Sequence, residues 1–258
     1  MWTIKSKERE NFIMFAYKTD IGKVRKRNED SAFIIENRFN DLFMLIFDGM
    51  GGHNRGDIAS SLAQKTMVDE FQKKEKFNGK FDMYFWLKKV ILKTNKILND
   101  YSHLHNDSKG MGTTFSCYLI HKNLTLMCYI GDTRCYLINN NEIKQESIDE
   151  TYVEFLYESG KITQREKQMH PQRNIITNAL GCYNSVIINL RFINKPYTHL
   201  LLCSDGLYKM VNEETISKII IQEDSLENKI VRLIDLANAF GGHDNIAIAL
   251  YEKERKND

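Results

Sequence analysis

The sequence predicts an α+β protein in which antiparallel sheets carry helices on their outer faces. Apolar runs of strand length occur in clusters between longer segments of helical periodicity. The regular strand–helix–strand alternation of a parallel, doubly wound sheet is absent, which favours antiparallel sheets. The chain has 258 residues, near the size at which one hydrophobic core stops growing. Because no repeat or Pro/Gly/Ser-rich linker divides it, we predict a single domain over residues 1–258.

The first part of the chain is predicted to contain strands followed by two helices. Strands are expected at residues 12–17, 32–35 and 42–47, of which the last is apolar throughout. A continuous apolar run of this length is typical of a strand buried on both faces. Helices are expected over residues 57–71 and 81–101, where apolar residues recur at steps of three and four.

The middle of the chain returns to strands and then loses any clear pattern. Strands are expected at residues 113–120, 124–130 and 135–138. The segment 149–181 is polar and contains little helical periodicity. We therefore interpret this segment as a mobile excursion from the core.

The last third combines strands with one long helix. Strands are expected at residues 186–192 and 199–203. A helix is expected over residues 226–240, and Ser225 stands where its N-cap is needed. Apolar residues then alternate over 246–250, which predicts a closing strand.

Composition and charge exclude several classes of protein. The 36 Lys and Arg residues are balanced by 34 Asp and Glu residues, which leaves a formal net charge of +2. This charge provides no strong positive field for nucleic acid or an anionic membrane, and we expect neither as a partner. The first residues lack the apolar run of a signal peptide, and 18 consecutive apolar residues occur nowhere. No transmembrane helix is therefore expected.

The cysteines indicate a reducing environment. There are 5 of them, an odd number, and none is spaced as Cys-x-x-Cys. This pattern argues against a disulfide or zinc framework. Most of them lie in apolar runs, where reduced, buried thiols are typical of a cytoplasmic protein, so a cytoplasmic location is expected.

A strand that ends in Asp-Gly occurs twice and is the most informative pattern in the sequence. The predicted strand 42–47 leads into Asp48-Gly49, and a later one leads through a serine into Asp205-Gly206. A carboxylate at the end of a buried strand is costly to desolvate unless a positive group meets it. The glycine lets the backbone turn and bring its carbonyl close to a bound ion. For either site alone, a simple turn is the alternative.

Two further aspartates stand beside glycines near predicted strand ends. Asp132 follows the glycine after strand 124–130, and Asp244 follows a Gly-Gly-His tripeptide before the closing strand. Four aspartates so widely separated in sequence can meet only through the fold. Carboxylate and carbonyl oxygens are hard ligands that suit Mg²⁺ or Mn²⁺ and suit zinc poorly. The four positions together predict a divalent-metal site.

Basic and acidic side chains are mixed in the segment 22–30. Arg25 and Arg27 can hold a phosphate through charge-assisted, bidentate contacts. The adjacent Glu29 and Asp30 can orient metal-bound water from outside the ligand set. A solvated turn whose charges neutralise one another is the alternative for this segment alone. Nucleic-acid contact ranks last, because the segment is short and interleaved with acids.

Six motifs occur together in the order of one known family. They cover nearly the whole chain and read Val24-Arg25-x-x-Asn28-Glu29-Asp30-Ser31, Asp48-Gly-Met-Gly-Gly-His53, Gly112-Thr-Thr114, Ile130-Gly-Asp132-Thr-Arg134, Cys203-Ser-Asp205-Gly206 and Gly242-x-Asp244-Asn245. In this set the sequence resembles the PPM-type, metal-dependent serine/threonine protein phosphatases, which form the protein phosphatase 2C family. The Asp-Gly-Met-Gly-Gly-His form is similar to the bacterial branch.

This resemblance implies a fold and an activity. The implied fold is a four-layer αββα sandwich, with two antiparallel sheets flanked by antiparallel helix pairs. The segment 149–181 corresponds to the flap that borders the active site of the family. The implied activity is hydrolysis of phosphomonoesters on serine and threonine residues of proteins, by direct attack of a hydroxide that bridges two Mn²⁺ or Mg²⁺ ions.

The resemblance also implies a set of metal ligands. Asp48 would bridge two ions, and the carbonyl of Gly49 would complete one of the two sites. Asp205 and Asp244 would bind the second ion. Asp132, together with Asp205, would serve a third, weaker site found in bacterial members.

Roles are implied for the surrounding residues as well. Arg25 would grip the substrate phosphate, Glu29 and Asp30 would hydrogen-bond metal-bound water, and Asn245 would support the ligands from outside their set. The implied partners are proteins phosphorylated on serine or threonine, including a cognate serine/threonine kinase. The protein itself is expected to be a monomer.

The sequence departs from the family at one position that matters for proton transfer. Members with an Asp-Gly-His motif carry histidine where this chain has Met50, so a general-acid role at this position is not carried over. His53 is either a nearby substitute or a structural loop histidine. The alternative function is a catalytically silent, phosphoprotein-binding domain on the same fold, which typically lacks the metal carboxylates that are all present here.

Overall fold

The apolar runs of the sequence form two antiparallel sheets that stack face to face. The computed structural model describes residues 8–9, 12–13, 15–50, 55–139 and 142–253. The first sheet, here called the β5 sheet, has the strand order β11 (Asn189–Phe192), β8 (Leu124–Ile130), β7 (Phe115–His121), β5 (Leu42–Met50) and β4 (Asp30–Glu36), with β6 (Gly112–Thr113) paired to the end of β5.

The second sheet, here called the β13 sheet, lies against the first. Its strand order is β10 (Glu142–Gln145), β9 (Arg134–Asn139), β12 (His199–Cys203), β13 (Ile246–Glu252) and β3 (Phe15–Asp20). The short strands β1 (Glu8–Arg9) and β2 (Phe12–Ile13) pair only with each other.

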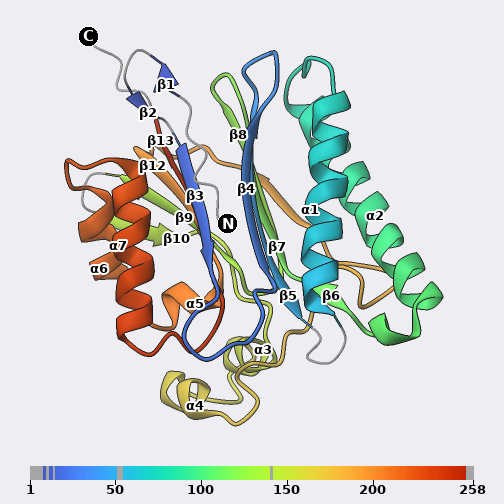
Figure 1. The fold of residues 1–258 in the computed structure, drawn as a ribbon, viewed down its shortest axis with the longest axis vertical. Helices are drawn as coiled ribbons and strands as arrows, with labels where there is room; N and C mark the ends of the chain where they lie inside the picture. Colours follow the sequence, from blue (N-terminus) through green and yellow to red (C-terminus); the bar gives the residue numbers. More distant parts are fainter. Residues whose placement is uncertain (1–7, 10–11, 14, 51–54, 140–141, 254–258) are drawn as a thin grey trace.

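Helices cover the outer face of each sheet, as Figure 1 shows. The pair α1 (Gly56–Lys73) and α2 (Lys80–Leu104) lies on the β5 sheet, and the pair α6 (Glu213–Ile220) and α7 (Leu226–Ala239) lies on the β13 sheet. The short elements are the 3-10 helix η2 (Asn106–Ser108), α3 (Tyr152–Glu158), α4 (Gln164–Met169) and α5 (Asp205–Tyr208). The predicted αββα sandwich is therefore confirmed.

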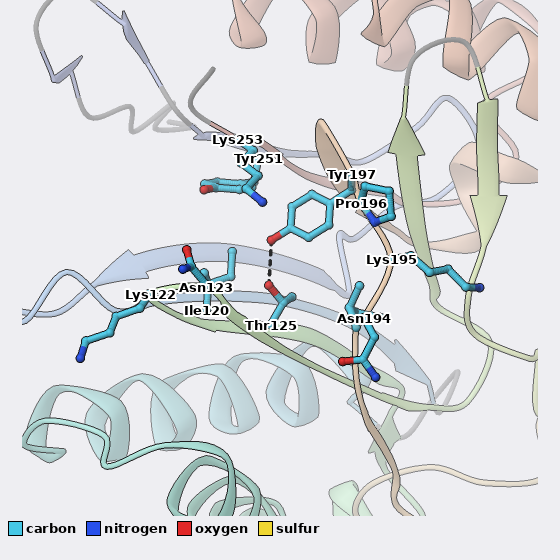
Figure 2. Close-up of a pocket in the computed structure, with 11 residues that line it drawn as sticks. Ile120, Lys122, Asn123, Thr125, Asn194, Lys195, Pro196, Tyr197, Tyr251 and Lys253 are labelled. Atoms are coloured by element: carbon cyan, nitrogen blue, oxygen red, sulfur yellow. Dashed lines mark hydrogen bonds between the residues drawn. The ribbon is translucent and has the colours of Figure 1, made fainter. Parts of the chain in front are cut away.

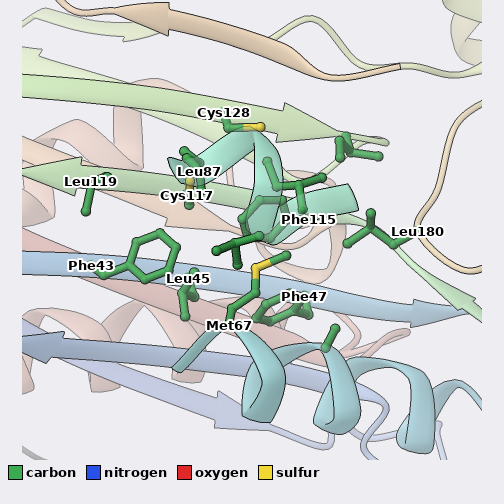
Figure 3. Packing of buried hydrophobic residues seen from close by; sticks show 14 of the residues in the cluster. Phe43, Leu45, Phe47, Met67, Leu87, Phe115, Cys117, Leu119, Cys128 and Leu180 are labelled. Atoms are coloured by element: carbon green, nitrogen blue, oxygen red, sulfur yellow. The ribbon is translucent and has the colours of Figure 1, made fainter. Parts of the chain in front are cut away.

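Strand β5 is buried on both faces, as its apolar run predicts. Phe43 and Phe47 point into the cluster between the β5 sheet and helices α1 and α2, together with Met67 (Figure 3). Met44 and Ile46, on the opposite face of the strand, join the cluster between the two sheets. A third cluster fills the space between the β13 sheet and helices α6 and α7. The two sheets are thus fixed to each other, and their strand ends share one edge.

Most predicted elements appear with small shifts of their ends, and the strand predicted at 199–203 is β12 itself. The strand predicted at 12–17 corresponds to β2 and the start of β3, and residue 14 between them lies outside the described residues. One prediction was wrong in its continuity: the strand predicted at 113–120 is divided between β6 and β7, because Thr114 belongs to neither. The strand predicted at 186–192 was wrong for its first part, since β11 begins only at residue 189.

The side chain of Asn178 explains the late start of β11. Its Nδ2 donates to the carbonyl of Ile187 at 2.8 Å, and its Oδ1 accepts from the amide of Ile187 at 3.3 Å. Because a side chain already satisfies this backbone, the ladder with β8 begins two residues later. Val186 and Ile188 nevertheless pack against the core, which accounts for the apolar pattern in the sequence.

The segment 149–181 lies at one edge of the sandwich, at the bottom of Figure 1, where it contains α3 and α4. Helix α4 has no buried residue, whereas α3 buries Val153. The bridge between Thr151 and Ile176 joins the two arms of the segment 149–181 to each other, and the bridge between Thr113 and Leu180 ties the segment to the core. Among the described residues, no helix is long and apolar enough to cross a membrane.

Candidate active site

Asp48 brings the predicted aspartates together at the edge shared by the two sheets. It lies near the end of β5, directly opposite Asp30 of β4 in the antiparallel register. Burial raises the pKa of Asp48 well above its ordinary value, and the charges of Asp30, Asp205, Asp132 and Asp244 raise it further. Only nearby charges can act in this way. The five carboxylates therefore form one electrostatic group, although they come from both sheets.

The backbone around Asp48 is held by hydrogen bonds. Its amide donates to Thr114 Oγ1 at 3.1 Å, and its carbonyl accepts from Thr113 Oγ1 at 3.0 Å. The next residue must be glycine, since a Cβ on Gly49 would lie 2.2 Å from the carbonyl oxygen of Gly56. Helix α1 begins at Gly56, so the start of this helix is packed directly against the predicted metal-binding turn.

Several buried carboxylate oxygens at this edge accept no hydrogen bond. Asp30 Oδ2, Asp132 Oδ1 and Asp205 Oδ1 are buried without a partner within the described part of the chain. Buried polar atoms normally find a hydrogen-bond donor, and unpaired carboxylate oxygens are especially costly. Oxygen ligands of this kind suit Mg²⁺ or Mn²⁺. The residues therefore fit the divalent ions that the sequence predicts.

The electrostatic cost of this arrangement appears in the pKa values. Burial, and then the charge of Asp205, raises the pKa of Asp132 to about 7. Burial is also the main cause of the raised pKa of Asp30, despite hydrogen bonds from Ser204. The pKa of Asp205 is raised by burial, against the opposing charge of Lys209. A divalent cation would relieve all of these unfavourable interactions at once.

Two basic side chains already neutralise part of this charge. Lys209 Nζ lies 2.6 Å from Asp205 Oδ2, and Arg25 Nη2 lies 2.8 Å from Asp244 Oδ2. No three His, Cys, Asp or Glu side chains of the described ranges are arranged as a complete ligand set. Metal binding would therefore require carboxylate side chains of this edge to move.

Arg25 is an exposed cation of this edge. Its side chain is 49% exposed, compared with 35% for Asp244. Partial burial alone would lower the pKa of Arg25, but Asp244, Asp205 and Asp48 raise it. The guanidinium is therefore firmly charged and accessible from solvent, as the sequence predicts for a phosphate-binding group.

Asn245 connects the Arg25 segment to β13. Its Oδ1 accepts from the amide of Glu29 at 2.9 Å, and its Nδ2 donates to the carbonyls of Ile21 and Arg27, both at 2.9 Å. The carbonyl of Glu29 in turn accepts from the amide of Gly49 at 3.1 Å. Burial and the charge of Asp57 raise the pKa of Glu29. A single asparagine thus fixes the turn that carries both Arg25 and Glu29.

Two residues of α5 belong to this site although the sequence did not single them out. Lys209, the C-cap of α5, also donates to Asn174 Oδ1 of the segment 149–181 at 3.0 Å. Tyr208 donates its hydroxyl to the carbonyl of Asp132 at 3.1 Å. The spacing of Lys209 four residues after Asp205 was the available signal, because a helix of one turn brings such a pair together.

Glu150 fastens the segment 149–181 to the same edge. Its Oε2 accepts from the amide of Gly131 at 2.8 Å and from Asn178 Nδ2 at 2.7 Å. Its Oε1 accepts from Asn189 Nδ2 at 2.8 Å. One carboxylate therefore joins both ends of the segment to the turn that carries Asp132.

His53, the candidate substitute for the missing histidine, lies outside the described residues.

Comparison with known proteins gives consistent results. The family profile described as protein phosphatase 2C matches residues 23–232. The chain is 35% identical to a serine/threonine phosphatase stp of Listeria welshimeri over 238 residues, which is 92% of this chain and 94% of that protein.

Solved structures of similar proteins show the same fold. The crystal structure of the serine/threonine phosphatase Stp1 from Staphylococcus aureus has a TM-score of 0.88 at 32% identity, over 98% of this chain and 100% of that one. The crystal structure of the serine/threonine phosphatase PstP/Ppp from Mycobacterium tuberculosis has a TM-score of 0.82 at 32% identity, over 93% and 98% of the two chains.

Proposed function

Because this chain belongs to the protein phosphatase 2C family and is a protein serine/threonine phosphatase, we propose that its shared carboxylate edge is the catalytic centre. The family implies dependence on divalent metal ions. We propose Mn²⁺ or Mg²⁺ as these ions, two in the core of the site and a third, weaker one beside them. The observation that carries this proposal is the set of buried carboxylate oxygens without hydrogen-bond partners on Asp30, Asp132 and Asp205.

The ligands of the ions come from both sheets. Asp48 and the carbonyl of Gly49 are supplied by β5 itself, whereas Asp205 begins α5 just after β12 and Asp244 lies just before β13. Asp132, with Asp205, is assigned to the third ion. When bound, divalent ions lower the pKa of water and stabilise the negative charge of a transferring phosphoryl group.

The other proposed site residues bind the substrate phosphate and orient water. Arg25 presents a planar set of donors that fits the oxygens of a phosphate in a bidentate manner. Its contact with Asp244 supports a position beside the proposed ligands. Glu29 and Asp30 accept hydrogen bonds from water in the site, and Asn245 keeps their turn in place through its three backbone contacts.

The substrates implied by the family are phosphorylated serine/threonine proteins. We propose that a cognate serine/threonine kinase is among them, and that the chain acts as a cytoplasmic monomer with one catalytic domain. The five free thiols, four of them buried, support the reducing location. The ties between residues 149–181 and the core support its assignment as the flap of this single domain.

The direct test is hydrolysis of a chromogenic phosphomonoester and of a phosphoserine peptide by the purified chain. Activity should appear with Mn²⁺ or Mg²⁺ and disappear when a chelator is added. Activity that persists in excess chelator would contradict the metal assignment. The silent phosphoprotein-binding alternative is not favoured, because every predicted carboxylate is present at the edge; phosphopeptide binding without turnover under any divalent ion would reinstate it.

A further inference from the structure

A cavity with basic lining lies at the edge of the sandwich opposite the aspartates. His121 ends β7 next to the pair Leu42 and Ile120, whereas Asp48 lies at the other end of β5. The cavity has a volume of about 460 Å³ and is lined by Lys76, Phe77, Asn78, Gly79, His121, Lys122, Asn123 and Leu124. Its charged lining residues are cationic, and it contains no carboxylate.

A buried histidine faces this cavity. His121 is 5% exposed, and its Nδ1 lies 2.5 Å from Oδ1 of Asp41, which is 1% exposed. The other oxygen of Asp41 accepts from Asn37 Nδ2 at 3.0 Å, so both oxygens of this carboxylate are engaged. Within the described ranges, no hydrogen-bond partner meets His121 Nε2. When both ring nitrogens carry protons, Nδ1 donates to Asp41 and Nε2 donates to a ligand.

The cavity also lies at the beginning of a long helix. Helix α2 has 25 residues, and its N-cap Gly79, at φ 108°, provides no side-chain hydrogen bond. The first amides of a helix have no intrahelical acceptor and carry partial positive charge. Asp82, in the first turn, is neutralised by Lys74, whose Nζ lies 3.0 Å from both of its oxygens. This carboxylate also accepts from the amide of Asn78 at 3.0 Å.

We propose that this cavity binds a phosphoryl group, either as inorganic phosphate or as part of a phosphorylated chain. When the ring carries both protons, His121 supplies a donor at Nε2, Lys76 and Lys122 supply charge, and Gly79 brings the positive end of α2 to the cavity. The site stands at the opposite end of the β5 sheet from the proposed catalytic centre and does not depend on the roles assigned there.

The adjoining cavity does not provide a comparable site. It has a volume of about 320 Å³ and shares Lys122 and Asn123 with the first cavity (Figure 2). Its two hydroxyls, Thr125 Oγ1 and Tyr197 Oη, lie 2.7 Å apart and satisfy each other. Lys195 Nζ is engaged by Glu146 at 2.9 Å, and Figure 2 shows Lys122 extending away from the two hydroxyls. Lys253, the third lysine of this lining, has its Nζ over the Tyr197 ring, 5.0 Å from the ring centroid, so it too is already engaged.

The test follows backbone amide NMR signals of the full, Mg²⁺-loaded chain at constant ionic strength. One arm adds inorganic phosphate, and the other adds a peptide with a non-hydrolysable phosphonate analogue of phosphoserine. Saturable shifts are expected at residues 76–80 and 121–124. Shifts with phosphate alone identify the free ion as the ligand, and shifts with the peptide identify a phosphorylated chain.

The variant Lys76→Ala/Lys122→Ala removes two exposed cations and should weaken binding roughly tenfold or more, since charge-assisted contacts are lost. Lys89→Ala, an exposed cation elsewhere on α2, is the matched control and should leave the affinity unchanged. The proposal is overturned by saturable shifts confined to the edge with Asp48, by shifts that sodium chloride reproduces, or by equal affinity of the double variant. Loss of catalytic activity has no bearing on these outcomes.

Discussion

At the scale of single residues, the carboxylates of the shared edge have the most distinctive environment. Asp48, Asp205 and Asp132 are buried close to one another, and each has a raised pKa for that reason. Clusters of carboxylates with raised pKa values are typical of catalytic and ligand-binding sites. Substitution of these aspartates by asparagine distinguishes the role of their charge from the role of their packing.

Replacement of Asp48 or Asp205 by asparagine keeps the shape of the side chain and removes its charge. Asp48→Asn and Asp205→Asn should each lower kcat by on the order of a hundredfold or more, since even groups that only support metal ligands have effects of 10–100-fold. Steady-state hydrolysis with Mn²⁺ measures the loss of kcat, and calorimetric metal titration measures the loss of metal affinity. Asp235→Asn, on the exposed face of α7, is the control. Unchanged turnover in either variant would exclude that residue as a ligand.

Arg25→Ala removes the exposed guanidinium of the site. The value of kcat/KM for phosphopeptide should fall by roughly ten- to a hundredfold, because a charge-assisted contact with phosphate is lost. Arg27→Ala, two residues away in the same turn, provides the comparison. Equal kinetics of the Arg25 variant and the unaltered protein would remove the phosphate-binding role.

The raised pKa of Asp132 has a consequence for stability in the presence of chelator. Its pKa is 3.8 in an exposed chain and about 7 when folded, so the folded state holds a proton that the unfolded state releases. Its contribution to stability is fully present below pH 3.8 and is lost as the pH rises through about 7. Denaturant unfolding across this range should show falling stability, with a smaller slope in Asp132→Asn. Greater stability of the unaltered protein on the alkaline side would contradict this assignment.

At the scale of elements, helix ends show how local sequence fixes local structure. Ser225, predicted as the N-cap of the last helix, accepts from the amide of Asn228 at 3.2 Å. Gly241 and Gly242 follow the C-cap with φ values of 133° and 53°. The sequence therefore determines both limits of α7 through short-range hydrogen bonds and backbone freedom.

Ser225→Ala should lower the free energy of unfolding by about 1 kcal/mol, because the cap hydrogen bond is lost. Catalytic activity should stay unchanged, since α7 lies on the outer face of the β13 sheet. Urea unfolding measures the effect, and Ser225→Asp, which restores a capping oxygen, is the control. A loss equal in both variants would mean that the cap contributes nothing.

Elements without a long periodic pattern could not be predicted. Strand β10 (Glu142–Gln145) alternates exposed and half-exposed residues, and α5 is a single turn. Helix α6 has only eight residues, so its buried face consists of Ile216, Ile219 and Ile220 close together. Periodicity needs a longer window than these elements offer, and their positions are decided by packing on neighbouring strands.

At the scale of the whole molecule, the proposed ligands join two sheets. Asp48 belongs to the β5 sheet, whereas Asp205 and Asp244 flank strands of the β13 sheet. An ion held between them binds only the folded chain. The sequence predicted these aspartates because each follows or precedes an apolar run. The spacing of Lys209 from Asp205 was a signal for their ion pair, but the role of Tyr208 depends on where α5 lies relative to Asp132 and could not be predicted.

Divalent ions should therefore raise the melting temperature. Saturation to a hundred times the dissociation constant adds about 2.7 kcal/mol to the free energy of unfolding. Calorimetry with Mn²⁺ and with chelator measures this difference. The variant Asp205→Asn should show a clearly smaller rise, and an undiminished rise in that variant would indicate that the ions bind elsewhere.

The contacts of Glu150 bear on how much change in length and sequence the segment 149–181 can tolerate. This carboxylate accepts from Gly131, Asn178 and Asn189, so it holds the two ends of the segment 149–181 together at one point. Lengthening such a closed loop adds little entropic cost. The intervening tip, where α4 has no buried residue, should therefore tolerate insertions and deletions while the edge beneath it keeps its structure.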